Sequence, residues 1–81
     1  MIKVQMFRKH TESPHHFPYG IEENFVNGTV DRMPSLGKGI LFYFDRLGKG
    51  WIRTSPIKEI IPGPDQTIFR TENSEYHIKE G

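Results

Sequence analysis

Hydrophobic and polar residues alternate with a period of two along the C-terminal half of the chain. The clearest stretches are Trp51 to Ile61 and Thr67 to Ile78. Residues 62–65, Pro-Gly-Pro-Asp, separate them and favour a tight turn. β-Branched and aromatic residues that alternate with polar ones between such turns are typical of short antiparallel strands. This half of the chain therefore predicts a β-meander.

The N-terminal residues 1–8 alternate in the same way and predict a first strand, with Ile2, Val4 and Met6 on one face. Residues 9–20 change character, because they hold three histidines, two prolines and a glycine without a usable period. Such a composition is typical of a loop, and we expect residues 9–20 to be a flexible one.

Asn27-Gly28 lies between short apolar pairs and has two interpretations. The dipeptide favours a type I′ hairpin turn, and it also fits an irregularity inside one longer strand. We favour a single strand over residues 24–33.

Residues 40–45 are the most hydrophobic run of the chain. They predict a strand that is either buried on both faces or exposes an aromatic face. No segment keeps helical spacing over more than one turn. The sum is five to seven short strands, which predicts an all-β fold: a small, partly open antiparallel barrel or curved sheet of the SH3-like or OB-like kind.

The length of 81 residues fits a single domain over residues 1–81. A domain of this size buries only about 60% of the surface of its unfolded chain, and its ten aromatic residues are an economical filling for a thin core. The chain has no cysteine, no run of about 20 apolar residues and no pattern of a secretory leader at its N-terminus. We therefore expect a cytoplasmic protein without a membrane partner.

The formal net charge of +1 gives no overall electrostatic attraction to nucleic acid. Basic residues are nevertheless denser in the middle of the chain, where residues 38–58 contain Asp45 as their one acid. A solvated strand face explains this distribution, and so does a basic flank of a binding surface.

Two short glycine loops with one lysine each flank the aromatic strand, at residues 36–39 and 47–50. Together with the rings between them they have the composition of a stacking platform for single-stranded nucleic acid or a nucleotide. The alternative is that these rings form the core. The candidate binding surface consists of Lys38, Tyr43, Lys49, Trp51 and Arg53.

The candidates for catalysis and metal binding are weak. His10, His15 and His16 with Glu12 are zinc-type or nickel-type ligands, but they lie in a proline-rich loop without fixed geometry. Ser55 has no neighbouring histidine and aspartate in the sequence pattern, and a cysteine nucleophile is absent. We expect no metal, no cofactor and no enzymatic activity.

Three segments carry a resemblance to a known group of proteins: Pro34-x-x-Gly37, Thr54-Ser55-Pro56-Ile57-x-x-Ile60 and Thr71-x-Asn73-Ser74-x-Tyr76-x-Ile78. With the aromatic strand, this pattern resembles a family of small β-proteins of bacteriophages and other mobile elements, over residues 34–79. The resemblance implies a compact β-protein of phage-like origin and no particular activity. In such a fold we expect Tyr76 to pack its ring inward and leave its hydroxyl in water.

The leading hypothesis is a non-enzymatic binding module, a phage or mobile-element accessory protein that engages a protein partner. The contact would use an exposed sheet edge, an aromatic surface or an interface between copies of the chain. The second hypothesis is a single-stranded nucleic-acid or nucleotide binder that uses the aromatic strand 40–44 and the flanking lysine loops.

Overall fold

A computed structural model describes residues 2–11, 24–45 and 50–80, and within these residues it contains strands and no helix. The strands are β1 (Ile2–Thr11), β2 (Val26–Val30), β3 (Leu41–Phe44), β4 (Trp51–Arg53), β5 (Glu59–Pro62), β6 (Thr67–Arg70) and β7 (Ser74–Glu80). The predicted all-β class is confirmed, at the upper end of the predicted strand number.

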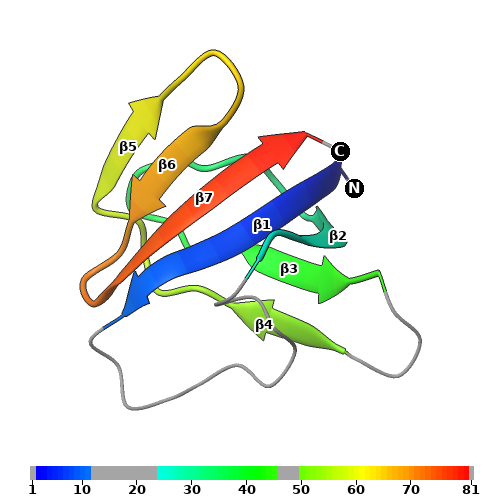
Figure 1. Ribbon diagram of the computed structural model, residues 1–81. Coiled ribbons are helices and arrows are strands. Elements are labelled where there is room, and N and C mark those ends of the chain that lie inside the picture. The colour runs from blue at the N-terminus through cyan, green and yellow to red at the C-terminus, as the bar shows by residue number, and fades with distance from the viewer. Residues whose placement is uncertain (1, 12–23, 46–49, 81) are drawn as a thin grey trace.

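The seven strands form one antiparallel sheet in the order β4-β3-β2-β1-β7-β6-β5. The long strand β1 lies at its centre and pairs with β2 and β7. Figure 1 shows the sheet curving strongly, with β4 and β5 at its two ends and the two chain ends side by side. The sheet does not close, and its shape agrees with the predicted small open barrel or curved sheet.

The inner face of the sheet carries the hydrophobic core. On β1 the predicted alternation is confirmed, since Val4 and Met6 are buried and Ile2 packs against the core. Met6 stands opposite Ile78 of β7 in the register, so neighbouring strands contribute to the same layer. The buried hydrophobic residues are Val4, Met6, Val30, Ile40, Phe42, Phe44, Ile57, Phe69, Tyr76 and Ile78.

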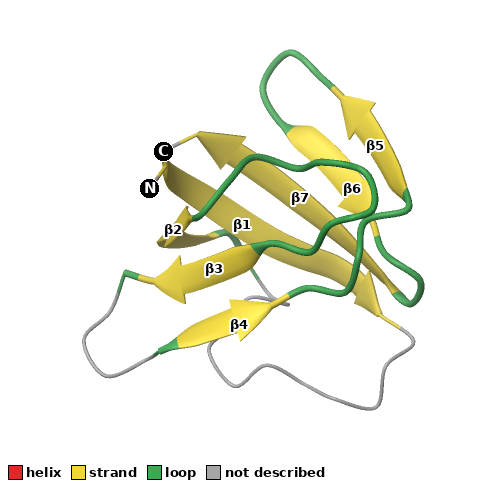
Figure 2. Cartoon of the chain, turned by 180° about the vertical axis from the view of Figure 1, so that it is seen from behind, coloured by secondary structure: helices red, strands yellow, loops and turns green. Residues whose placement is uncertain are grey.

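Two connections complete the core. The β2–β3 connection and the β4–β5 connection cross the same side of the sheet, as Figure 2 shows. They meet where Leu36 and Ile57 form a parallel bridge, supported by hydrogen bonds from Gly37 N to Ile57 O (2.8 Å) and from Ile57 N to Lys38 O (3.2 Å). Ile40 and Ile57 are buried, and burial of each such side chain stabilises the fold by about 1.5–3 kcal/mol.

The predicted loop over residues 9–20 begins too early. β1 continues to Thr11, because a register shift after Arg8 lets His10 pair with Glu75 and Thr11 with Ser74. Pairing with β7 thus outweighs the local turn formers. Residues 12–20 of the predicted loop lie outside the described residues.

Asn27-Gly28 is not a hairpin turn. Both residues lie inside β2, as favoured, although the strand is shorter than residues 24–33. Gly28 pairs with Val4 on one side and Phe44 on the other. A Cβ atom at this position would collide with the Phe42 ring and the Tyr43 carbonyl, so the glycine permits a close approach between strands.

Tyr76 is buried more deeply than expected, with 3% of its surface exposed. Its ring stacks on Phe69 at 5.0 Å between centroids. Burial raises the pKa of its hydroxyl, which also interacts with the side chains of Arg8 and Ser74. The prediction of a hydroxyl in water is wrong, because Arg8 stands opposite Tyr76 and is itself buried.

Candidate functional site

The aromatic strand β3 divides its side chains between the core and the outer face. Phe42 and Phe44 are buried, with their ring centroids 5.2 Å apart in an edge-to-face arrangement. Leu41 and Tyr43 alternate with them and are half-buried. The strand is therefore not buried on both faces. Phe42 and Phe44 belong to the core, whereas Tyr43 lies on the outer face.

Trp51 is the most exposed aromatic side chain of the described residues, with 58% of its surface accessible. It stands directly opposite Tyr43 in the β3–β4 register, and Tyr43 stands opposite Thr29 of β2. Directly opposed residues of antiparallel strands hold their Cβ atoms about 4.5–5.5 Å apart on one face of the sheet. Tyr43 and Trp51 are thus directly opposed aromatic residues, an aromatic pair in the register of the outer face.

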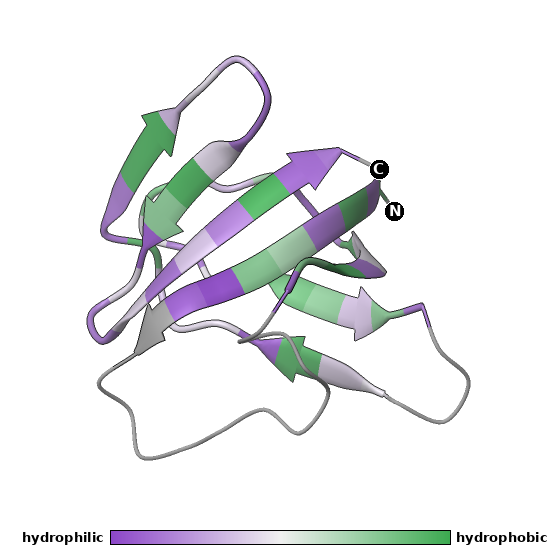
Figure 3. Cartoon of the chain, viewed as in Figure 1, coloured by the Kyte–Doolittle hydropathy of each residue, from purple (hydrophilic) through white to green (hydrophobic). Residues whose placement is uncertain are grey.

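β4 is an edge strand that pairs only with β3 among the described residues. Gly50 O accepts a bond from Phe44 N (3.0 Å), and Thr54 N donates to Ile40 O (2.9 Å). Because alternate residues of an antiparallel strand point their backbone groups toward the same neighbour, Ile52 bonds with β3, and Trp51 and Arg53 point their N–H and C=O groups away from it. The edge therefore offers two donors and two acceptors. In Figure 3 the colour of β4 changes from hydrophobic green in its middle to hydrophilic purple at its C-terminal end.

A pocket of about 480 Å³ opens where β2 ends, β3 begins and β4 ends. Three of its lining residues are cationic, Arg32, Lys38 and Arg53, and one is acidic, Asp31. Its remaining lining residues are Gly39, Leu41, Thr54 and Pro56. The volume lies within the range of roughly 300–1,000 Å³ that is usual for ligand pockets.

The acidic residue of this pocket is already engaged. Asp31 Oδ1 accepts a hydrogen bond from Leu41 N (3.1 Å), and Oδ2 pairs with Arg32 Nε (3.3 Å). The side chains of Lys38 and Arg53 have no hydrogen-bond or ion-pair partner within the described part of the chain. The pocket therefore carries a formal surplus of two positive charges, which Lys38 and Arg53 present.

The structure brings most of the predicted surface together. Trp51 and Arg53 are exposed on β4, Tyr43 lies beside Trp51, and Lys38 shares the pocket with Arg53. Lys49 lies outside the described residues. Sequence reasoning missed Arg32, because only the pairing of β2 with β3 places the residues after Val30 beside Leu41.

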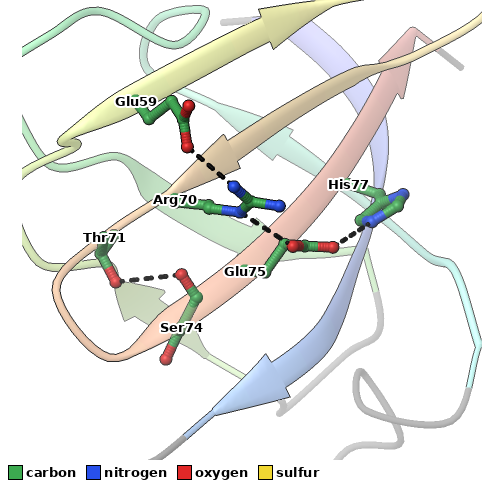
Figure 4. Close-up of polar contacts among 6 residues, drawn as sticks. All are labelled: Glu59, Arg70, Thr71, Ser74, Glu75 and His77. Atoms are coloured by element: carbon green, nitrogen blue, oxygen red, sulfur yellow. Dashed lines mark hydrogen bonds and ion pairs between the residues drawn. The ribbon is translucent and has the colours of Figure 1, made fainter.

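The other end of the sheet holds a chain of charges across β5, β6 and β7, drawn in Figure 4. Arg70 binds Glu59 and Glu75, each at 2.9 Å, and Glu75 also pairs with His77 Nε2 at 2.9 Å. These interactions lower the pKa of the Glu75 carboxyl, with the His77 hydrogen bond as the largest cause and the Arg70 bond next. The network ties three strands together and lies far from β4 in the strand order.

Leu36 and Ile61 are the other large apolar side chains that the described residues expose, at 63% and 39%. Leu36 belongs to the β2–β3 connection, and Ile61 lies on the other edge strand, β5. Neither stands opposite an aromatic residue, since Leu36 pairs with Ile57 and Ile61 with Ile68, whereas Trp51 pairs with Tyr43. Ile61 therefore serves as a matched apolar reference at the second edge.

The described residues contain no group of three or more histidines or acids that would hold a metal ion. His15 and His16 lie outside these residues, so the expectation of no metal site stays a prediction. None of the described segments forms a helix with the length and apolarity needed to cross a membrane.

No protein-family model, curated protein or solved structure matches the chain. The resemblance to phage and mobile-element β-proteins therefore stays a prediction. The case for a function rests on the outer surface of β3 and β4.

Proposed function

We propose that the protein is a non-enzymatic binding module that takes up an extended segment of a protein partner along β4. The observation that carries this proposal is Trp51, a largely exposed indole on an edge strand that pairs only with β3 among the described residues. An edge of this kind adds a strand by main-chain hydrogen bonds, and neighbouring side-chain contacts give specificity. The resemblance to phage and mobile-element proteins suggests an accessory protein that engages a host or phage protein.

The position of Trp51 favours a specific contact over non-specific hydrophobic association. Trp is enriched among the residues that dominate binding energies, and Trp51 stands opposite a second aromatic residue, Tyr43, in the strand register. β4 is only three residues long, and short edge strands limit indiscriminate pairing with other chains. Arg53 adds a charge that restricts which partners fit.

The test is capture of partners from an extract of the source organism after nuclease treatment. Replacement of Trp51 by alanine should weaken capture by about thirtyfold, since a central tryptophan contributes roughly 2 kcal/mol or more to binding. Trp51 is exposed, so the variant should remain folded. The control is Ile61→Ala on β5, which should capture the same protein as the wild type.

Two results would contradict the proposal. Equal loss in Trp51→Ala and Ile61→Ala would place the contact elsewhere or show a general loss of fold. A captured protein that nuclease treatment removes would show that nucleic acid bridges the contact.

A second candidate function is binding of single-stranded nucleic acid. The specific observation in its favour is that Lys38 and Arg53 line one pocket beside the aromatic pair. Such a surface combines cations for phosphates with rings for bases. Binding to an oligothymidine should then weaken steeply with salt, because neutralised phosphates release counterions, and Lys38→Glu together with Lys49→Glu should abolish it. The net charge of +1 gives little long-range attraction to a phosphate backbone, so we place this function second.

A further inference from the structure

We propose that the partner segment docked on β4 carries an acidic side chain that enters the Arg32–Lys38–Arg53 pocket. We further propose that this residue comes two positions before a large apolar or aromatic residue that packs on Trp51. This inference rests on the proposed strand addition and specifies the chemistry of its ligand.

The register of the sheet places the pocket and the aromatic pair in neighbouring rows. One row on the outer face runs through Leu41 and Arg53, and the next runs through Tyr43 and Trp51. Side chains of a strand alternate between faces with a period of two. A strand added beside β4 therefore places two residues, i and i+2, on this face, one next to Arg53 and the other next to Trp51.

The charge of the pocket selects the residue next to Arg53. The Asp31 carboxylate is engaged by Arg32 and Leu41 N, whereas Lys38 and Arg53 have no side-chain partner among the residues described. A carboxylate beside Arg53 lowers the surplus from two positive charges to one, and a lysine or arginine there meets like charge. Because Lys38 and Arg53 are exposed, this charge complementarity contributes more to the specificity for a partner than to the affinity.

The direction of the added strand follows from the sheet. All strand pairs of this sheet are antiparallel, and antiparallel pairing is slightly more stable per residue than parallel pairing. In an antiparallel partner the residue next to Arg53 precedes the residue next to Trp51. The partner therefore reads acidic, any residue, then apolar or aromatic.

A displayed library of random peptides tests this pattern with the full chain. Selection on the wild type should enrich Asp or Glu two positions before an aromatic or large aliphatic residue. Selection on Lys38→Glu/Arg53→Glu should enrich Lys or Arg at the acidic position instead. An acidic peptide selected on the wild type should bind the double variant with at least about tenfold lower affinity than the wild type. Binding is measured by the fluorescence of Trp51, the one tryptophan of the chain.

The matched control is Lys3→Glu/Lys58→Glu, which changes the net charge equally at two exposed lysines outside the pocket. It should keep the acidic preference, and circular dichroism should show that both double variants retain the β fold. Peptides enriched for an aromatic residue without any acidic bias would overturn this inference and leave strand addition standing.

Two further results would overturn more than the acidic preference. Failure to enrich any peptide, or enrichment that Trp51→Ala does not affect, would overturn the inference and strand addition together. Oligothymidine binding that weakens with salt and that Lys38→Glu/Arg53→Glu removes would show that the pocket binds phosphate. The proposal of a protein ligand would then be wrong, and nucleic acid would take its place.

Discussion

At the level of single residues, Gly28 allows close packing between its own strand and the two neighbouring strands. It lies in β2 between Val4 of β1 and Phe44 of β3, with the Phe42 ring against its Cα. From the sequence, Asn27-Gly28 fits either a turn, because the dipeptide is usual in turns, or an irregularity inside a strand, which we favour. Local composition does not reveal that a ring from another strand needs the space.

Gly28→Ala is therefore expected to destabilise the protein by roughly 1–3 kcal/mol, the usual range for overpacking a filled core. The added methyl group meets the Tyr43 carbonyl, which belongs to the backbone and moves less readily than a side chain. Urea unfolding measures the change. Ser55→Ala, at an exposed position, is the control and should stay within about 0.5 kcal/mol of the wild type. A Gly28→Ala variant as stable as the wild type would contradict the close packing.

At the level of strands, the sequence predicts where the strands lie along the chain better than it predicts their order in the sheet. The alternation along Trp51, Ile52 and Arg53 correctly separates the two faces of β4, and the structure shows that Trp51 and Arg53 are the exposed ones. It does not say that β4 is an edge strand, because strand order depends on which distant segments pair. For the same reason the sequence pattern does not show the pocket or the place of Arg32 in it.

The charge network across β5, β6 and β7 gives stability a dependence on pH. The pKa of Glu75 lies below its usual value of 4.5 in the folded protein. Its contribution is fully present above the unfolded pKa, at about pH 5 and higher, and is lost as the pH falls through the folded pKa, because the unfolded chain takes up the proton first.

Glu75→Gln should therefore lower the free energy of unfolding near pH 6, and the difference from the wild type should shrink below about pH 4. Denaturant unfolding at a series of pH values measures it. Glu72→Gln, in the turn before β7, should show a smaller difference. A Glu75→Gln effect that stays constant down to pH 3 would contradict a role for its ionised carboxylate.

At the scale of the whole molecule, the sheet stays open at two edges while its core is covered. The β4–β5 connection leads from one edge strand to the other, and its Ile57 is buried against the β2–β3 connection. The two edges are not equivalent. β5 includes Pro62, which lacks a backbone donor, whereas β4 carries Trp51 and Arg53 with their outward backbone groups. This asymmetry is the physical basis for assigning the partner to β4.

Amide hydrogen exchange of β4, measured by NMR with and without the captured partner, tests this assignment most directly. In the free protein the amides of Trp51 and Arg53 should exchange fast and those of Ile52 and Thr54 slowly, because only the latter two bond with β3. The bound partner should slow the amide exchange of Trp51 and Arg53 and leave the amide exchange of β5 unchanged. Slow exchange at Trp51 and Arg53 in the free protein, or new protection on β5 instead of β4, would contradict the account.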